Sequence, residues 1–225
     1  MQIKYNTISI VGNLRNTIKK ERLALIGSRN ISEATFEYGR FLGYEMVKQG
    51  YTVVSGLAMG ADRTGMLGAI QAIKDGHSGS VIGLAPTTPY NVYPKKHQDL
   101  YDLVKQYGML VYPYDLTTYE YLPYKKTMQN PYARFPEYPL LTDRSLLNGL
   151  IVSEVHALLD DYVVTGGSRY AVTMGLKDNL PTFVWHPTPN GFRRSPALIE
   201  KKVSNTKLLY PNMAEDLNYI LEHLI

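Results

Sequence analysis

The chain has 225 residues, of which 44% are hydrophobic and 20% are charged, a composition typical of a globular protein rather than a disordered one. It contains no cysteine, which excludes disulfides and thiolate metal sites, and no apolar run approaches the ~18 residues of a membrane-spanning helix. The net charge of +4 permits an anionic partner without demanding one, and the N-terminus lacks a signal-peptide pattern, so we expect a cytoplasmic protein.

Strand and helix patterns alternate through the first half of the chain. Residues 1–20 are expected to be an irregular lead-in. Behind them, apolar runs bounded by polar residues predict four strands, at 22–27, 51–56, 80–85 and 108–113. Apolar residues at helical spacing predict three intervening helices, at 33–49, about 59–76 and about 96–107.

The second half is less regular. Residues 114–141 are rich in tyrosine and proline and predict a long ordered loop or an insertion. Residues 143–161 mix two signals and favour a helix, with 150–155 as a possible strand inside it. The remaining patterns predict a strand and turn at 161–167, a helix at about 169–178, a strand at 181–187 and a helix at about 213–224.

This alternation predicts a Rossmann-like three-layer α/β domain, with a mostly parallel sheet and helices on both faces. In such sheets, ligands bind beyond the carboxyl ends of the strands. The corresponding loops carry glycines and small hydroxyl residues, and Arg29 and Arg169 add forked donors suited to phosphate oxygens. A helix N-terminus behind such a loop attracts anions, so the pattern favours a phosphate site. The alternative is that the glycines only form strand-to-helix turns.

Other chemistry finds less support in the sequence. No P-loop is present and no GxGxxG follows the first strand, so neither ATP hydrolysis nor NAD chemistry is favoured. The five histidines lack ligand spacing, so we expect no metal and no cofactor. Glu154 and His156 would not face a common point on a helix, and Asp62 is expected to cap a helix rather than act as an acid. We therefore expect no catalytic residues.

Tyrosine is concentrated in one part of the chain. Eleven of the 19 tyrosines lie between Tyr90 and Tyr138, interleaved with basic residues. A nucleic-acid base stacked on an aromatic ring contributes ~1–3 kcal/mol, so such a segment suits single-stranded nucleic acid. The alternative is that these rings pack half-buried in an extended surface loop.

Several segments resemble, in order, the core of the DNA-processing protein A (DprA/Smf) family over roughly residues 8–220. They are LALIGSRNIS, GYTVVSGLAMGADRTGMLGAI, VIGLAP with YNVYPKKHQDLY, GMLVYP and DRSLLNGL. The resemblance implies a non-catalytic protein that binds single-stranded DNA in DNA processing and recombination, through loading of a RecA-type recombinase or DNA uptake in natural transformation. It also implies a possible homodimer. We expect a single domain over residues 1–225, without the C-terminal winged-helix domain of many members.

The resemblance assigns a phosphate pocket to three motifs and extends it with three further residues. The motif residues are Gly27, Ser28 and Arg29; Ser55, Gly56, Leu57, Met59 and Gly60; and Gly166, Gly167, Ser168 and Arg169. Lys95, Phe135 and Arg144 would extend the DNA path, whereas Met66 stands where the family has a histidine. The alternative function is a sensor or hydrolase that binds a nucleotide or nucleotide derivative in the same pocket. The PGGxGTxxE signature of the phosphoribohydrolases in this superfamily is not present.

Overall fold

The structure is a computed structural model that describes most of the first half of the chain and separate parts of the second. The described residues are 9–13, 21–85, 92–112, 154–158, 180–188, 206–209 and 213–222, together with Ser168, Val172 and Gly175. The tyrosine-rich segment 114–141 and the predicted strand and turn at 161–167 lie outside these residues.

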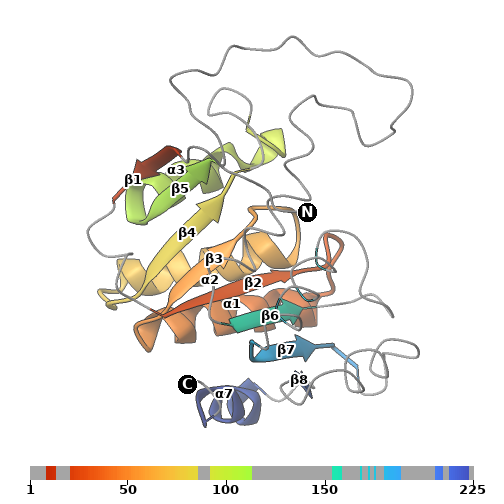
Figure 1. The fold of residues 1–225 in the computed structure, drawn as a ribbon. Helices are drawn as coiled ribbons and strands as arrows, with labels where there is room; N and C mark the ends of the chain where they lie inside the picture. Colours follow the sequence, from red (N-terminus) through yellow and green to blue (C-terminus); the bar gives the residue numbers. More distant parts are fainter. Residues whose placement is uncertain are drawn as a thin grey trace, which may run out of the picture.

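The described strands form one eight-stranded sheet in the order β1-β5-β4-β3-β2-β6-β7-β8 (Figure 1). All neighbours are parallel except β1, which pairs antiparallel with β5. The strands are β1 Ser9–Gly12, β2 Arg22–Gly27, β3 Thr52–Ser55, β4 Ser80–Leu84, β5 Met109–Tyr112, β6 Glu154–Leu158, β7 Thr182–Trp185 and β8 Thr206–Leu209. The predicted α/β class with a mostly parallel sheet is confirmed.

Helices connect and cover the strands. They are α1 Glu33–Lys48, α2 Ala61–Lys74, α3 Gln98–Tyr107 and α7 Met213–Glu222, with the 3-10 turn η1 Lys95–His97 before α3. Ser32 caps α1, because its side chain accepts a hydrogen bond from Thr35 N–H. Figure 1 shows α1 and α2 side by side behind β2 and β3, and α7 packs against α1 and against Phe183 of β7.

The sheet is buried on both faces. Alternate residues of β2 enter two different hydrophobic clusters, since successive strand side chains point to opposite faces. Leu23 and Leu25 belong to the cluster that includes residues of α1, α2, α3 and α7. Ala24 and Ile26 join the second cluster, together with Val172, which is helical. Helices therefore lie on both faces, as predicted.

Three predictions for local structure were wrong. Residues 154–158 form a central strand, β6, instead of a helix, because β2 and β7 pair with them on either side. Glu154 and His156 accordingly lie on a strand. Ser9–Gly12 forms β1 within the expected irregular lead-in, and Thr206–Leu209 forms β8 between the predicted strand at 181–187 and the predicted helix at about 213–224, where no further element was expected. Both are outer strands whose state is set by pairing with β5 and β7.

The strand order reverses beside β2. From β2, the chain adds β3, β4 and β5 in one direction, and it later places β6, β7 and β8 on the other side. Such a reversal opens a crevice outside the carboxyl ends of the two central strands. The loop after β2 and the loop after β3 both lie at this carboxyl edge.

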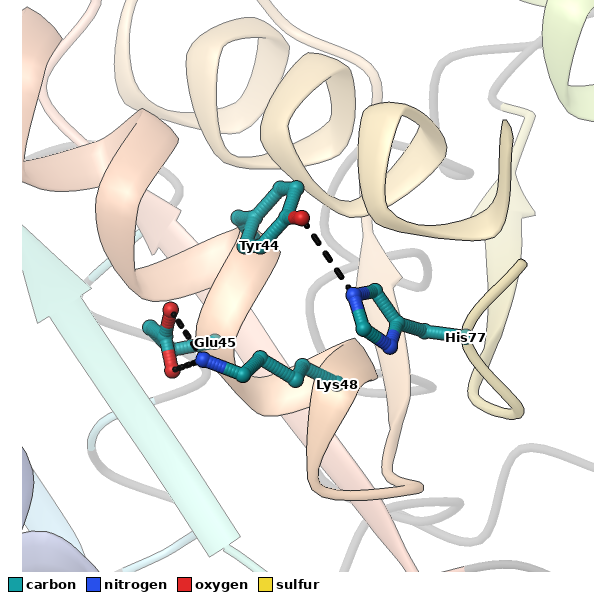
Figure 2. Close-up of polar contacts among 4 residues, drawn as sticks. All are labelled: Tyr44, Glu45, Lys48 and His77. Carbon is teal, nitrogen blue, oxygen red and sulfur yellow. Dashed lines mark hydrogen bonds and ion pairs between the residues drawn. The ribbon is translucent and has the colours of Figure 1, made fainter. Parts of the chain in front are cut away.

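The amino edge of the sheet lies at the other end of α1. There, the Tyr44 hydroxyl lies 3.3 Å from His77 Nε2, and Lys48 forms an ion pair with Glu45 at 3.1 Å (Figure 2). The sixteen residues of α1 span ~24 Å at 1.5 Å per residue, so Lys48 is well separated from the carboxyl edge. Substitution of Lys48 therefore serves as a control for substitutions of cations at the carboxyl edge.

Candidate functional site

The GSR loop consists of Gly27, Ser28 and Arg29 and begins at the last residue of β2. Gly27 lies so close to β6 that an added Cβ would overlap the carbonyl oxygen of Leu158. Ser28 is buried, and its N–H donates to the same oxygen at 2.9 Å. Arg29 is exposed. The loop therefore anchors its backbone against β6 and presents the Arg29 side chain to solvent.

The glycine-rich loop, residues 56–60 between β3 and α2, packs against the GSR loop. Ala61 N–H donates to the Ser28 carbonyl at 3.0 Å. Gly60 has φ +76°, and an added Cβ would overlap that same carbonyl oxygen. Gly60 also occupies the N-cap position of α2 without any side-chain cap. Two predicted parts of the pocket thus meet backbone to backbone at a helix N-terminus.

The other predicted residues of this loop lie deeper or at its rim. Ser55 and Leu57 are fully buried, and Gly56 is buried. Met59 is half-buried. Within the described part of the chain, the Ser55 hydroxyl has no hydrogen-bond partner. Met66, one turn into α2, is fully buried in the main hydrophobic cluster.

Asp62 holds the loop from inside α2. Its Oδ2 accepts a hydrogen bond from Ala58 N–H at 3.3 Å, and the residue is only 5% exposed. The interpretation of Asp62 as the cap residue of α2 was wrong in detail, since Gly60 occupies that position. The carboxylate instead satisfies a backbone donor of the loop and adds a negative charge to the first turn of the helix.

The η1 turn reaches the same loop from the carboxyl side of β4. His97 is buried, and its Nδ1 lies 3.0 Å from the Leu57 carbonyl oxygen. Burial lowers the pKa of His97, and the Leu57 carbonyl opposes this shift by raising it. Lys95 and Lys96, in the same turn, are exposed. This contact therefore fixes two exposed cations relative to the glycine-rich loop.

An ion pair joins the two helices beside this contact. Arg63 of α2 donates to both carboxylate oxygens of Asp99, at 3.1 and 2.7 Å. These bonds hold the pKa of Asp99 below its ordinary value. Arg29, Lys95 and Lys96, by contrast, form no ion pair with any residue in the described ranges. Their charges remain open to an anionic ligand.

Ser168 connects the third predicted motif to the GSR loop. Its Oγ donates to the Gly27 carbonyl at 3.0 Å, although 140 residues lie between the two positions. The rest of the motif, and two of the three residues expected to extend the path, lie outside the described residues. They are Phe135, Arg144, Gly166, Gly167 and Arg169. The third residue of the path, Lys95, is exposed in η1.

Sequence reasoning missed His97, Arg63 and Asp99 as parts of this edge. His97 stands in the segment YNVYPKKHQDLY and Arg63 directly follows Asp62, so both lie in motifs already singled out. Their partners are far away in sequence, and only the folded chain pairs them. Over the described part of the chain, no three His, Cys, Asp or Glu residues gather as a metal site. No helix there is long and apolar enough to span a membrane.

One family model matches more than half of the chain. The model of a family described as DNA recombination-mediator protein A matches residues 4–130, which include the GSR loop, the glycine-rich loop and η1. Comparison with curated protein sequences finds no match.

Solved structures share the fold at low sequence identity. DNA processing protein A from Helicobacter pylori, which was studied for its single-stranded DNA binding mode, superposes with a TM-score of 0.73 at 19% identity, covering 100% of this chain and 91% of that one. The protein of the same name from Streptococcus pneumoniae gives 0.67 at 19% identity, covering 94% of this chain and 65% of that one. A molybdenum cofactor binding protein from Rippkaea orientalis gives 0.56 at 16% identity, covering 92% and 99%.

Proposed function

The chain belongs to the DNA recombination-mediator protein A family and is a DNA-processing protein, and on this premise we propose that it binds single-stranded DNA at the carboxyl edge of its sheet. The observation that carries the proposal is the contact between the GSR loop and the glycine-rich loop, where Ala61 N–H meets the Ser28 carbonyl at 3.0 Å. This contact lies at the N-terminus of α2, which attracts anions. Exposed Arg29, Lys95 and Lys96 supply positive charge from neighbouring loops.

In this proposal, the DNA backbone lies along the loops and the bases face outward. Phosphate oxygens accept hydrogen bonds from loop N–H groups and from Arg29, because charge-assisted bonds are the strongest available there. Lys95 contacts a neighbouring phosphate. The remaining predicted residues, which are Phe135, Arg144, Gly166, Gly167 and Arg169, would complete the path and offer an aromatic ring for stacking.

We further propose that binding involves no catalysis. The Asp62 carboxylate is buried and accepts a hydrogen bond from the Ala58 N–H, a structural role that supports this part of the proposal. Transfer of the bound strand to a RecA-type recombinase and assembly into a homodimer are part of the proposal, because the family resemblance implies them. A RecA strand-exchange assay and the mass of the protein in solution test these two points. The single domain over residues 1–225 and the cytoplasmic location stay predictions.

Binding of fluorescent oligo-dT across a salt series tests the proposal. If about four phosphates are contacted, log K falls with log[salt] at a slope of about −3, since each phosphate on a single strand contributes about −0.7. Arg29→Ala should weaken binding about tenfold, whatever the base sequence, because a charge-assisted hydrogen bond is lost. Lys48→Gln is the matched control, since it removes an exposed charge at the opposite edge.

Two outcomes would contradict the proposal. Absence of binding at low salt, together with thermal stabilisation by a mononucleotide, would favour the nucleotide-binding alternative. Equal losses for Arg29→Ala and Lys48→Gln would mean that DNA responds only to net charge and that the site is misplaced.

A further inference from the structure

The glycine-rich loop contains a backbone conformation that its own sequence disfavours. Leu57 has φ +57° and is the one non-glycine residue with positive φ in the part of the chain that the structure describes. Such values are uncommon for a bulky residue, because its Cβ crowds the backbone in the left-handed region. Surrounding contacts must therefore hold this residue in place.

Leu57 is held from two sides. Its buried side chain fills the space over Gly83 of β4, where an added Cβ would lie 2.8 Å from Leu57 Cδ1. Its carbonyl lies 3.0 Å from His97 Nδ1. Because a carbonyl oxygen only accepts, His97 must carry the proton of this bond on Nδ1.

The next residues of the loop are tied to α2, and α2 is tied to α3. Ala58 N–H donates to Asp62 at 3.3 Å, and the adjacent Arg63 makes its forked ion pair with Asp99, two residues after His97. The first turn of α2 therefore binds the loop through Asp62, and it is joined to the first turn of α3 through Arg63 and Asp99. The exposed Lys95 and Lys96 belong to the same turn as His97, so any movement of His97 also moves these two cations.

We propose that His97 is a positioning residue for the DNA site, an inference that rests on the proposed function. Its Nδ1–H bond holds the left-handed turn at Leu57 and sets the lysines of η1 beside the loop N–H groups. The loop N–H groups and the lysines of η1 then contact successive phosphates of one DNA strand. His97 itself is buried and does not touch the DNA.

A matched pair of variants tests this role. The amide nitrogen of asparagine occupies the place of His97 Nδ1, whereas that of glutamine reaches the place of Nε2. His97→Asn therefore keeps a donor toward Leu57, and His97→Gln loses it. We expect His97→Asn to bind oligo-dT within about threefold of the native protein and His97→Gln to bind at least tenfold more weakly, a difference of about 1.4 kcal/mol. Binding is measured at a temperature where circular dichroism shows both variants folded.

The salt series adds a readout that general destabilisation does not change. Lys95→Gln should reduce the size of the salt slope by about 0.7 in the native background and with His97→Asn, since one phosphate contact is lost. In the His97→Gln background, Lys95→Gln should not change the salt slope further, because Lys95 is already displaced from its phosphate.

The affinities of the native protein and of the two variants each support or contradict the positioning role of His97. Equal affinities for the Asn and Gln variants would overturn the positioning role, whether both bind well or both bind poorly. If the native protein does not bind oligo-dT, the proposed function fails and the role of His97 falls with it, so the native measurement separates the two failures. Should His97→Gln not fold, NMR of the native protein takes its place. Oligo-dT should then shift the His97 ring and Leu57 amide signals, and unchanged signals would overturn the proposal.

Discussion

At the scale of single residues, Gly60 lies where the glycine-rich loop packs tightly against the GSR loop. Gly60→Ala should lower the free energy of unfolding by at least about 2 kcal/mol, because alanine meets both a disfavoured φ and the Ser28 carbonyl. It should also weaken oligo-dT binding, since the two loops are forced apart. Chemical denaturation and anisotropy measure the two effects.

Gly76→Ala is the control for this substitution. Gly76 also has a positive φ, +92°, but no atom lies within 4 Å of an added Cβ. Its cost should be limited to backbone strain, about 1 kcal/mol, with DNA affinity unchanged. Equal losses of stability at the two positions would mean that the close approach at Ser28 contributes nothing.

A second pair of residues lies at opposite ends of β3. The Ser55 and Thr52 hydroxyls are both buried, and neither finds a hydrogen-bond partner within the described residues. Ser55→Ala and Thr52→Val should each raise the free energy of unfolding by about 1 kcal/mol, since burying an unpaired hydroxyl is unfavourable. Only Ser55→Ala should weaken oligo-dT binding, because Ser55 lies at the carboxyl edge. Native-like affinity for this variant would remove Ser55 from the predicted pocket.

How far single site residues could be predicted depended on where their partners lie. Motif residues such as Gly27 and Gly60 stand out in the sequence, because glycine is what a close backbone approach requires. His97 does not stand out, because its partner is the main-chain carbonyl of Leu57, forty residues earlier. No side-chain pattern marks a carbonyl acceptor, so this contact appears only in the folded chain.

At the scale of elements, burial of η1 against the glycine-rich loop makes stability depend on pH. Burial lowers the pKa of His97 in the folded state, so below about 6.5 the unfolded chain takes up the proton first. The stability that the folded state gains from keeping His97 neutral is fully present above pH 6.5. It is lost as the pH falls toward the lowered pKa of His97. The thermal midpoint should therefore be lower at pH 5.5 than at pH 7.5. The decrease should be smaller in His97→Asn, because asparagine does not titrate in this pH range. An equal fall in both proteins would contradict this.

The elements themselves were predictable where burial has a simple pattern. β2 coincides with the predicted strand 22–27, because a strand buried on both faces is a continuous apolar run. β6 was mistaken for a helix, because Glu154 and His156 interrupt its apolar residues and helix-favouring residues surround them. Its strand conformation is decided by hydrogen bonds to β2 and β7, which are distant in sequence.

At the scale of the whole molecule, the central strand β2 joins two arms of the sheet. Trp185, the single tryptophan, lies in the β7 arm, where it is 2% exposed and stacks on Tyr38 of α1 at 4.3 Å. Because α1 belongs to the other arm, we expect both arms to unfold together. Tryptophan fluorescence and far-UV circular dichroism should then give the same denaturation midpoint. An earlier fluorescence transition would show that the β7 arm unfolds by itself.

The place of β6 beside β2 also has a consequence during protein synthesis. The ribosome releases β2, β3, β4 and β5 as one uninterrupted stretch, but the strand that covers the other side of β2 follows only after residue 153. At about 5–20 residues per second, residues 113–153, which separate β5 from β6, take about 2–8 seconds to synthesise. Throughout this time, the nascent chain carries β2 as an open edge, the kind of surface that pairs with other chains. A trigger-factor-type chaperone that shields this edge should therefore raise the yield of native protein more than one added after release.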